Sequence, residues 1–433
     1  MTFFAVLLGL IAFLYLGMPL FAGLTVFSAA ILWAVKGELG TVGEFVFGHI
    51  NTYLLVAIPL FMLMAQFMVR GRVVDDLYAA AHTMVRHLPG GIAVATVAAC
   101  AVFAAISGSS VATALTIGAI AIPQMLKYNY HPHTVYGVVA AGGTLGILIP
   151  PSAPMVLYAF VAETSIGALF MAGVFPGLIL ATMFAAYAMA VEWRREKSFG
   201  PDYRRPQRAS LGEIATAVRK SFWALTLPPF VLGGMYLGIF TATEAAGTGA
   251  LYALFIAGVV YRNLSLADVW ACVVDATRTS AMLFLIIIGA ALFGHMLIIL
   301  RIPNEIVDLV IRYEISLYVF LACVILLLFL MGLVLESIAI ILITTPVLIP
   351  VLQHMAVNKV WYGVLLTINL EMALISPPVA LNLLVIKAIT GAPMSEISRA
   401  AVPFMLIIAV MLLLLVLFPG IALWLPGRMQ LGN

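Results

Sequence analysis

The sequence is poor in charge and in cysteine. Only 9% of its 433 residues are Asp, Glu, Lys or Arg, and the three cysteines lie singly in apolar runs without metal-ligand spacing. We expect Cys100, Cys272 and Cys323 to be buried small hydrophobes. Hydrophobic residues make up 64% of the chain and the mean hydropathy is +1.17. This composition is typical of an integral membrane protein.

Catalytic motifs are also missing. The seven histidines form no His-Glu-x-x-His pattern, and the chain has no Gly-x-Ser-x-Gly elbow and no Gly-Lys-Ser/Thr phosphate loop. An intramembrane enzyme would need a clustered acid, base or metal set, and none is visible. We therefore predict that the protein is not an enzyme, has no organic cofactor, and takes its energy from an ion gradient.

Basic residues are concentrated in one hydrophilic segment, residues 192–221. By the positive-inside rule this segment is cytoplasmic. Acidic residues alternate with the basic ones, so we interpret it as a solvated loop and predict no nucleic-acid binding. The basic residues of this segment are Arg194, Arg195, Lys197, Arg204, Arg205, Arg208, Arg219 and Lys220.

Two stretches of the chain share one pattern of prolines. Pro123 precedes the pair Pro150-Pro151 by the same distance along the chain as Pro350 precedes the pair Pro377-Pro378. The spacing indicates a repeat, which predicts three parts: a first repeat over 1–191, a basic linker over 192–221 and a second repeat over 222–433. Spans of about 20 residues allow about ten to twelve membrane segments in an all-α polytopic fold.

Each repeat contains a pair of short apolar runs. Residues 92–105 and 111–125 are too short to cross a hydrocarbon core of about 30 Å as helices, and Ser107-Gly-Ser-Ser110 joins them. We therefore predict two inverted repeats, each with a re-entrant helical hairpin, at about 92–126 and about 317–351. A single kinked span is the alternative for the first hairpin.

An interrupted helix follows each hairpin, at residues 135–152 and 361–378. In the first, Gly142, Gly143 and Gly146 lie just before the proline pair, which favours an unwound segment. Non-helical backbone at membrane depth persists only when buried in protein or lining a cavity. Matching interruptions in two halves of a chain therefore indicate the binding site of a secondary transporter.

Small hydroxyl groups and free carbonyls suit a dehydrated Na⁺, because hard cations take oxygen ligands. Half-helix N-termini at the hairpin tips favour an anionic group between them, and a neutral substrate is the alternative. The cation candidates are Ser107, Ser110 and the backbone between Gly146 and Pro151 in the first copy, and Gly332, Ala373 and Ser376 in the second. The substrate-region candidates are Ser109, Thr113, Thr144, Ser152, Ser337 and Asn382.

Three acids lie in apolar surroundings: Glu244, Glu336 and Glu371. Each costs on the order of 3 kcal/mol at a bilayer centre, so we expect each to face a partner or a cavity. We predict a structural or gating role, in which Glu336 and Glu371 orient the backbone of the second site. A buried brace that never touches substrate is the alternative.

Four motifs resemble the large membrane subunit of tripartite ATP-independent periplasmic (TRAP) transporters. The resemblance covers nearly the whole chain, and although each motif is weak alone, their order and spacing are specific. The motifs are Ala104-Ala-Ile-Ser-Gly-Ser-Ser110, Gly146-Ile-Leu-Ile-Pro-Pro-Ser152, Thr243-Glu-Ala-Ala246 and Asn369-x-Glu371 followed by Pro377-Pro-Val-x-x-Asn382.

The resemblance implies an elevator-type Na⁺ symporter, with a scaffold and a mobile transport domain that carries both hairpins. It also implies a multi-pass protein of the bacterial inner membrane, surrounded by lipid, with two partners: a separate small four-helix membrane subunit and a periplasmic solute-binding protein. Its implied Na⁺ ligands are Ser107, Ser110, Gly146, Ile149 and Pro151 at one site, and Gly332, Ala373, Ser376 and Pro378 at the other.

The second site departs from the family pattern. The family commonly has Gly where this chain has Ala373 and Ala380, and Thr or His where it has Ser376, so added methyl groups constrain the unwound backbone. The function predicted is Na⁺-coupled import of an organic acid, a C4-dicarboxylate or another carboxylate, delivered by the periplasmic protein. The alternative is a self-sufficient Na⁺-dicarboxylate symporter of similar hairpin architecture.

Overall fold

The computed structural model describes residues 6, 8–10, 12–13, 17–37, 40, 42–198 and 207–429. Part of the predicted first repeat, the middle of the linker with Arg204 and Arg205, and residues 430–433 lie outside these ranges. The described helices are α2 (Leu20–Lys36), α3 (Val42–Ile50), α4 (Ala57–Arg70), α5 (Val73–Val85), α6 (Gly91–Ser107), α7 (Ser110–Lys127), α8 (Pro132–Leu148), α9 (Ala153–Val161), α10 (Ile166–Glu196), α11 (Leu211–Tyr236), α12 (Ala242–Phe255), α13 (Leu266–Ile299), α14 (Ile302–Arg312), α15 (Leu317–Gly332), α16 (Ser337–His354), α17 (Lys359–Leu374), α18 (Leu381–Thr390), α19 (Met394–Leu417) and α20 (Gly420–Leu423).

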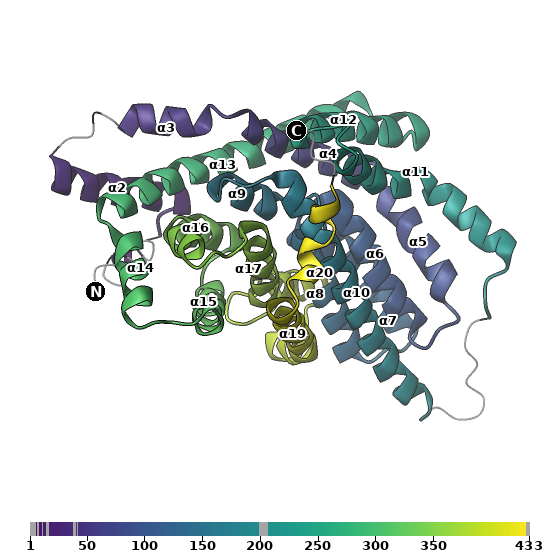
Figure 1. Cartoon of the computed structure of the whole chain (residues 1–433). Coiled ribbons are helices and arrows are strands. Elements are labelled where there is room, and N and C mark those ends of the chain that lie inside the picture. The colour runs from purple at the N-terminus through teal and green to yellow at the C-terminus, as the bar shows by residue number, and fades with distance from the viewer. Residues whose placement is uncertain are drawn as a thin grey trace.

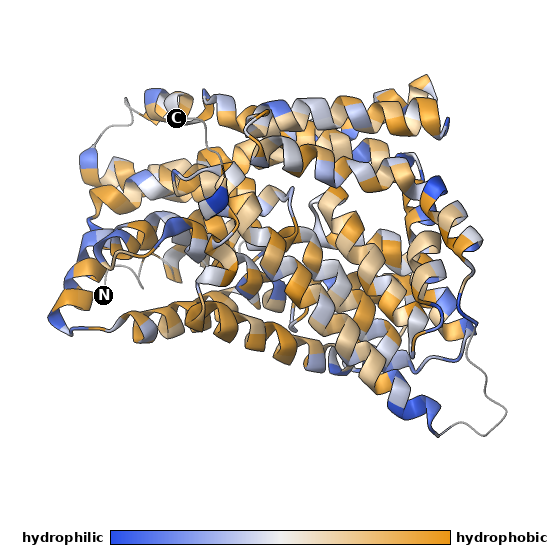
Figure 2. Ribbon diagram, turned by 45° about the vertical axis from the view of Figure 1, so that its right-hand side comes forward, coloured by the Kyte–Doolittle hydropathy of each residue, from blue (hydrophilic) through white to orange (hydrophobic). Residues whose placement is uncertain are grey.

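Within the described ranges the chain has helices and no strands. Eight helical segments there are long and apolar enough to cross a membrane, with α8 and α9 counted as one, and α2, α6, α15 and α18 are shorter apolar helices. Hydrophobic colour covers nearly every helix in Figure 2. The chain is therefore an all-α, multi-pass membrane protein. Eight is fewer than the ten to twelve segments predicted from chain length. Two of the eight, α7 and α16, are hairpin arms that the sequence indicated were too short to cross.

The helices form two groups. One contains α2, α4, α12 and α13, in which α2 and α4 pack on α13 and α12 packs on α4. The other contains the two hairpins and the interrupted helices. Figure 1 shows α15 and α16 to the left of α17, α6 and α7 to the right of α8, and the first group along the top. Contacts of α13 with α16 and of α4 with α6 join the two groups.

Helices recur at one spacing in the two halves. The helices α7 and α16 begin at residues 110 and 337 and both have 18 residues, while α8 and α17 begin at residues 132 and 359. The helices α5 and α14 end at residues 85 and 312. Each pair is separated by the same length of chain as Pro123 and Pro350, so the helix boundaries follow the spacing of the prolines.

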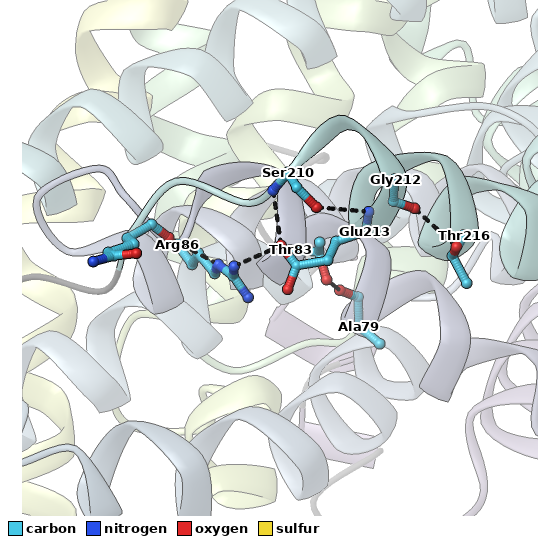
Figure 3. Close-up of polar contacts among 8 residues, drawn as sticks. Ala79, Thr83, Arg86, Ser210, Gly212, Glu213 and Thr216 are labelled. Carbon is cyan, nitrogen blue, oxygen red and sulfur yellow. Dashed lines mark hydrogen bonds and ion pairs between the residues drawn. The ribbon is translucent and has the colours of Figure 1, made fainter.

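The linker is shorter than predicted from charge, because α10 continues to Glu196 and α11 begins at Leu211. Its second end is tied to α5. Arg86 forms an ion pair with Glu213 at 3.0 Å and donates from Nε to the carbonyl of Gln207, while Ser210 and Glu213 cap α11 reciprocally (Figure 3). This capping box supplies acceptors for otherwise unpaired N–H groups of the first turn.

The open base of hairpin 1 lies at the linker end of the molecule. Arg195, near the end of α10, donates to the carbonyl of Asn129, which lies between α7 and α8. The backbone N–H of Gly90, which precedes α6, donates to Glu196. Since α10 begins beside the end of α9, the interrupted pair α8–α9 runs away from the linker.

The base of hairpin 2 lies at the other end. Lys359, the first residue of α17, donates from Nζ to the carbonyl of Ala162 after α9, at 3.0 Å. The Tyr158 hydroxyl donates to the carbonyl of Lys359 at 2.7 Å. Hairpin 2 ends at His354, shortly before Lys359. The two hairpins therefore extend toward each other from opposite ends of the molecule.

Candidate functional site

Hairpin 1 turns where the serine-glycine motif predicts. The helix α6 ends at Ser107, Gly108 has a left-handed φ of +60°, and Ser109 caps α7 by accepting a hydrogen bond from the N–H of Ala112. A Cβ atom on Gly108 would lie 2.4 Å from the carbonyl oxygen of Pro151. The turn therefore rests directly on the interruption between α8 and α9.

The unwound segment is shorter than predicted. The helix α8 stays helical through Gly142, Gly143 and Gly146, and only residues 149–152 leave it. A Cβ atom on Gly146 would lie 2.4 Å from the carbonyl oxygen of Ser109. The prediction that these glycines unwind the helix was wrong: they remove side chains so that hairpin 1 packs against its backbone.

Uncharged oxygens converge at this turn, which we name the first centre. The hydroxyls of Ser107 and Thr113 lie 2.9 Å apart, and Thr113 donates to the carbonyl of Ser109 at 2.8 Å. Ser107 and Thr113 are buried, and the Pro151 carbonyl borders the same turn. Among the described residues no group of three His, Cys, Asp or Glu could hold a metal ion. The chemistry suits a monovalent cation that needs oxygens but no carboxylate.

Two substrate-region candidates, Ser152 and Thr144, hydrogen-bond to the backbone of α8. Ser152 donates to the carbonyl of Ile147 at 2.6 Å, and Thr144 donates to the carbonyl of Ala141 at 2.8 Å. Both side chains are buried. Ile149, a predicted cation ligand through its backbone, has the extended conformation that ends the helix. These bonds hold the interrupted backbone in place, and they leave neither hydroxyl pointing to open space.

The second centre forms where hairpin 2 meets α17. A Cβ atom on Gly332 would lie 2.3 Å from the Cβ of Ala373, which is the counterpart of Gly146 in the register that pairs Pro123 with Pro350. The methyl group of Ala373 fits because Gly332 has no side chain. The Ser376 hydroxyl donates to the carbonyl of Met372, four residues earlier, at 2.7 Å, so it hydrogen-bonds to the last turn of α17.

The interruption between α17 and α18 covers residues 375–380 and includes Pro378. Ser337 is buried as the first residue of α16. Ala380 precedes α18 with a left-handed φ of +43°, a conformation that glycine adopts more readily. The hydrogen-bonded hydroxyl pair of the first centre has no counterpart among these residues.

Asn382 belongs to the second copy but contacts the first centre. Its side-chain oxygen accepts a hydrogen bond from Ser110 at 3.0 Å, and its amide nitrogen donates to the carbonyl of Ala140 at 3.1 Å. Of the predicted site residues, the structure thus brings Ser107, Ser109, Ser110, Gly146, Pro151, Thr113 and Asn382 together. The residues of the second centre form a separate group.

The three predicted acids differ in environment. Glu244 is exposed and accepts from the N–H and hydroxyl of Thr241, which makes it the acidic member of the α12 capping box. Glu336 is exposed at the tip of hairpin 2 and forms no capping bond with its side chain. Glu371 is fully buried in α17 and neither carboxyl oxygen has a hydrogen-bond partner in the structure. Glu244 therefore has the partner expected of it, whereas Glu371 is buried without one among the described residues.

Sequence reasoning missed a cavity of about 920 Å³ away from the linker end. Its walls come from α3 and α13 on one side and from α9 and α16 on the other, and its polar lining includes Glu163, His295 and Lys359. Lys359 uses one of its donors on Ala162. The cavity lies between α13 of the first group and α9 and α16 of the second.

A signal for this cavity was present in α16. Proline has no N–H, so Pro346 and Pro350 deprive the carbonyls of Leu342 and Pro346 of their usual helical partners. Leu342, Pro346 and Pro350 all line the cavity. Unpaired carbonyls in a membrane helix need water or other donors, which is consistent with a wetted wall.

Comparison with known proteins identifies the family. The family described as "Tripartite ATP-independent periplasmic transporter, DctM component" matches residues 7–421. The chain belongs to this family. It is 40% identical to the C4-dicarboxylate TRAP transporter large permease protein DctM of Pseudomonas aeruginosa, over 87% of this chain and 86% of that one.

A second relative of this TRAP chain is longer. The isethionate TRAP transporter permease protein DctMQ of Oleidesulfovibrio alaskensis is 35% identical over 96% of this chain and 65% of its own length. The YdaH transporter of Alcanivorax borkumensis has a similar fold, with a TM-score of 0.67 and 14% identity over 89% of this chain and 88% of that one. The Pseudomonas aeruginosa and Oleidesulfovibrio alaskensis relatives are both TRAP permeases. The chain is therefore the large permease subunit of a TRAP transporter.

Proposed function

We propose that this TRAP permease imports an organic acid together with Na⁺. The observation that carries the proposal is the first centre, where buried hydroxyls and carbonyls converge without a formal charge. Such a site suits a dehydrated monovalent cation. A second cation binds where Gly332 meets Ala373, through backbone oxygens of the interruption that contains Ser376 and Pro378.

The architecture of the proposal is an elevator built on inverted repeats. Hairpins that extend from opposite ends, with helix boundaries that recur at one spacing, support inverted repeats. In this arrangement α2, α4, α12 and α13 form the scaffold, and the hairpins with the interrupted helices form the transport domain. The cavity of about 920 Å³ between the two groups is the route by which the solute reaches the hairpin tips.

Two relatives and the local charge support an organic anion as the substrate. The names of the two relatives specify a C4-dicarboxylate and isethionate, both organic anions. The N-terminal ends of α7 and α16 meet the two centres and favour an anion beside the bound cations. Lys359, in the cavity wall, provides a positive charge on the route.

The partners are a small four-helix membrane subunit and a periplasmic binding protein that delivers the acid in a bacterial inner membrane. The DctMQ relative supports the first partner, since this chain matches only 65% of its length. With the linker cytoplasmic by the positive-inside rule, the cavity opens on the periplasmic side, where a binding protein would dock.

The test is uptake of labelled C4-dicarboxylates and isethionate into proteoliposomes that contain this chain and its small subunit. An inward Na⁺ gradient and the binding protein should both be required. Ser107→Ala should raise the Na⁺ concentration needed for half-maximal uptake about tenfold. Ser221→Ala, which removes a buried hydroxyl bonded within α11, is the matched control.

Two results would contradict the proposal. Uptake that is equal with Na⁺ and with K⁺ would exclude Na⁺ coupling. Robust Na⁺-driven uptake without the binding protein would mean that the hairpins alone select the solute, as in a self-sufficient symporter.

A further inference from the structure

One buried amide connects the two halves of the chain. Asn382, in the first turn of α18, is fully buried. Its Oδ1 accepts from the Ser110 hydroxyl at 3.0 Å and its Nδ2 donates to the Ala140 carbonyl at 3.1 Å. The partners lie in α7 and α8, so one side chain from the second half ties together the hairpin and the interrupted helix of the first.

The surroundings of Asn382 are shaped to receive it. A Cβ atom on Gly143 would lie 3.0 Å from the Asn382 amide nitrogen, so a side chain there would press on this amide. Buried amides are costly when their polar atoms are unpaired, and here both are paired. The same Cβ would lie 2.7 Å from the Cβ of Ala114, so both hairpin 1 and the Asn382 amide require the space that Gly143 leaves.

Asn382 also lies close in sequence to the second centre. Ser376 and Pro378 precede it by six and four residues, within the interruption that leads into α18. Any displacement of the interruption shifts the start of α18, because α18 begins at Leu381, directly after the interruption ends at Ala380. Asn382 thus links the backbone of the second centre to the hydroxyl of Ser110, which begins α7 beside the first centre.

The link is one-sided. In the register that pairs Pro123 with Pro350, the first-copy counterpart of Asn382 is Met155, a buried apolar residue of α9 that makes no equivalent polar bond. If this contact served only to pack the helices, the repeat could carry it in both copies. Only the second copy has the amide, and its hydrogen bonds reach residues of the first copy.

We propose that Asn382 is a positioning residue that couples occupancy of the two cation centres. This inference rests on the proposed function, since it takes both centres as Na⁺ sites. A cation in the second centre draws the interruption around it and fixes the start of α18. The Asn382 amide then holds Ser110 in the orientation in which the first centre binds its own cation.

Coupling of this kind is reciprocal, so either cation strengthens binding of the other. For the wild type this predicts that Na⁺ binding depends sigmoidally on Na⁺ concentration, with a Hill coefficient clearly above 1. Coupling between sites typically amounts to a factor of about 5 to 150 in affinity. Without Asn382 the two sites should bind independently, with a Hill coefficient near 1.

The experiment compares Asn382→Leu, a substitution of similar size, with Asn369→Leu. Asn369 is also a buried amide in the second half, but it donates to the Ile325 carbonyl at 2.9 Å and so stays within its own copy. Na⁺-dependent uptake and the Na⁺-dependent rise in melting temperature of the purified permease are measured, with K⁺ replacing Na⁺ at constant ionic strength. Asn382→Ala serves as a second variant in case the leucine does not fit.

The expected result is that Asn382→Leu and Asn382→Ala lower the Hill coefficient to about 1 and raise the half-saturating Na⁺ concentration at least fivefold. Asn369→Leu should lower stability while leaving the Hill coefficient unchanged. The coupling is overturned if uptake depends on Na⁺ but the wild-type Hill coefficient is 1. It is also overturned if both Asn382 variants keep the wild-type Hill coefficient. If neither the uptake rate nor the melting temperature of the wild type depends on Na⁺, the proposed function itself is overturned.

Discussion

Gly332 and Ala373 make a contact that tolerates one methyl group but not two. An added Cβ on Gly332 would lie 2.3 Å from the Ala373 Cβ, whereas carbon atoms pack best at about 3.5–4.0 Å. Gly332→Ala must therefore separate hairpin 2 from α17 by roughly 1.5 Å. Overpacking of this kind costs about 1–3 kcal/mol, which corresponds to roughly 5- to 150-fold in an equilibrium.

The assay measures the melting temperature of the purified permease and the half-saturating Na⁺ concentration for uptake. Gly332→Ala should lower the melting temperature, or raise the half-saturating Na⁺ concentration roughly 5- to 150-fold. The double variant Gly332→Ala with Ala373→Gly should recover most of the loss, because it moves the methyl group from one side of the contact to the other. Gly233→Ala is the control, since a Cβ there meets nothing within 4 Å.

The reasoning fails if Gly332→Ala behaves like Gly233→Ala, because the contact would then not be tight. It also fails if the double variant is no better than the single one. In that case the glycine would be required for backbone freedom and not for the space that it leaves to Ala373.

Three further substitutions test other contacts. Gly146→Ala places a Cβ 2.4 Å from the carbonyl of Ser109 and should reduce Na⁺-driven uptake at least tenfold, with no rescue by trimming a side chain, because the opposing atoms are backbone. Ala380→Gly relieves the left-handed φ of +43° and should raise the unfolding free energy by about 1 kcal/mol, so a lower melting temperature would contradict it. The N–H of Ser210 is the main cause that lowers the pKa of Glu213 from 4.5. The stability contributed by the ionised carboxylate is therefore complete above pH 4.5 and is lost as the pH falls below that value. Glu213→Gln should reduce the fall in melting temperature that the wild type shows at acidic pH.

The sequence predicted the turn of hairpin 1 and the break after α8 because both depend on local chemistry. Glycine at 108 ends α6, serine at 109 caps α7, and the proline pair at 150–151 removes helical N–H groups. The same reasoning failed for Gly142, Gly143 and Gly146. A glycine inside a helix lowers helix propensity whether it permits unwinding or close packing, so local sequence does not distinguish the two.

The sequence by itself determined that the chain is a multi-pass helical membrane protein, where its helices break, and to which transporter family it belongs. Composition, proline spacing and motif order carry this information, and none of them depends on which segments touch. Only the tertiary structure decided that Asn382 contacts the first centre, that Gly332 makes room for Ala373, and that Glu244 lies exposed at the surface. Each of these outcomes depends on contacts between residues far apart in the chain or on the burial of a side chain. Helical periodicity and residue type do not specify either.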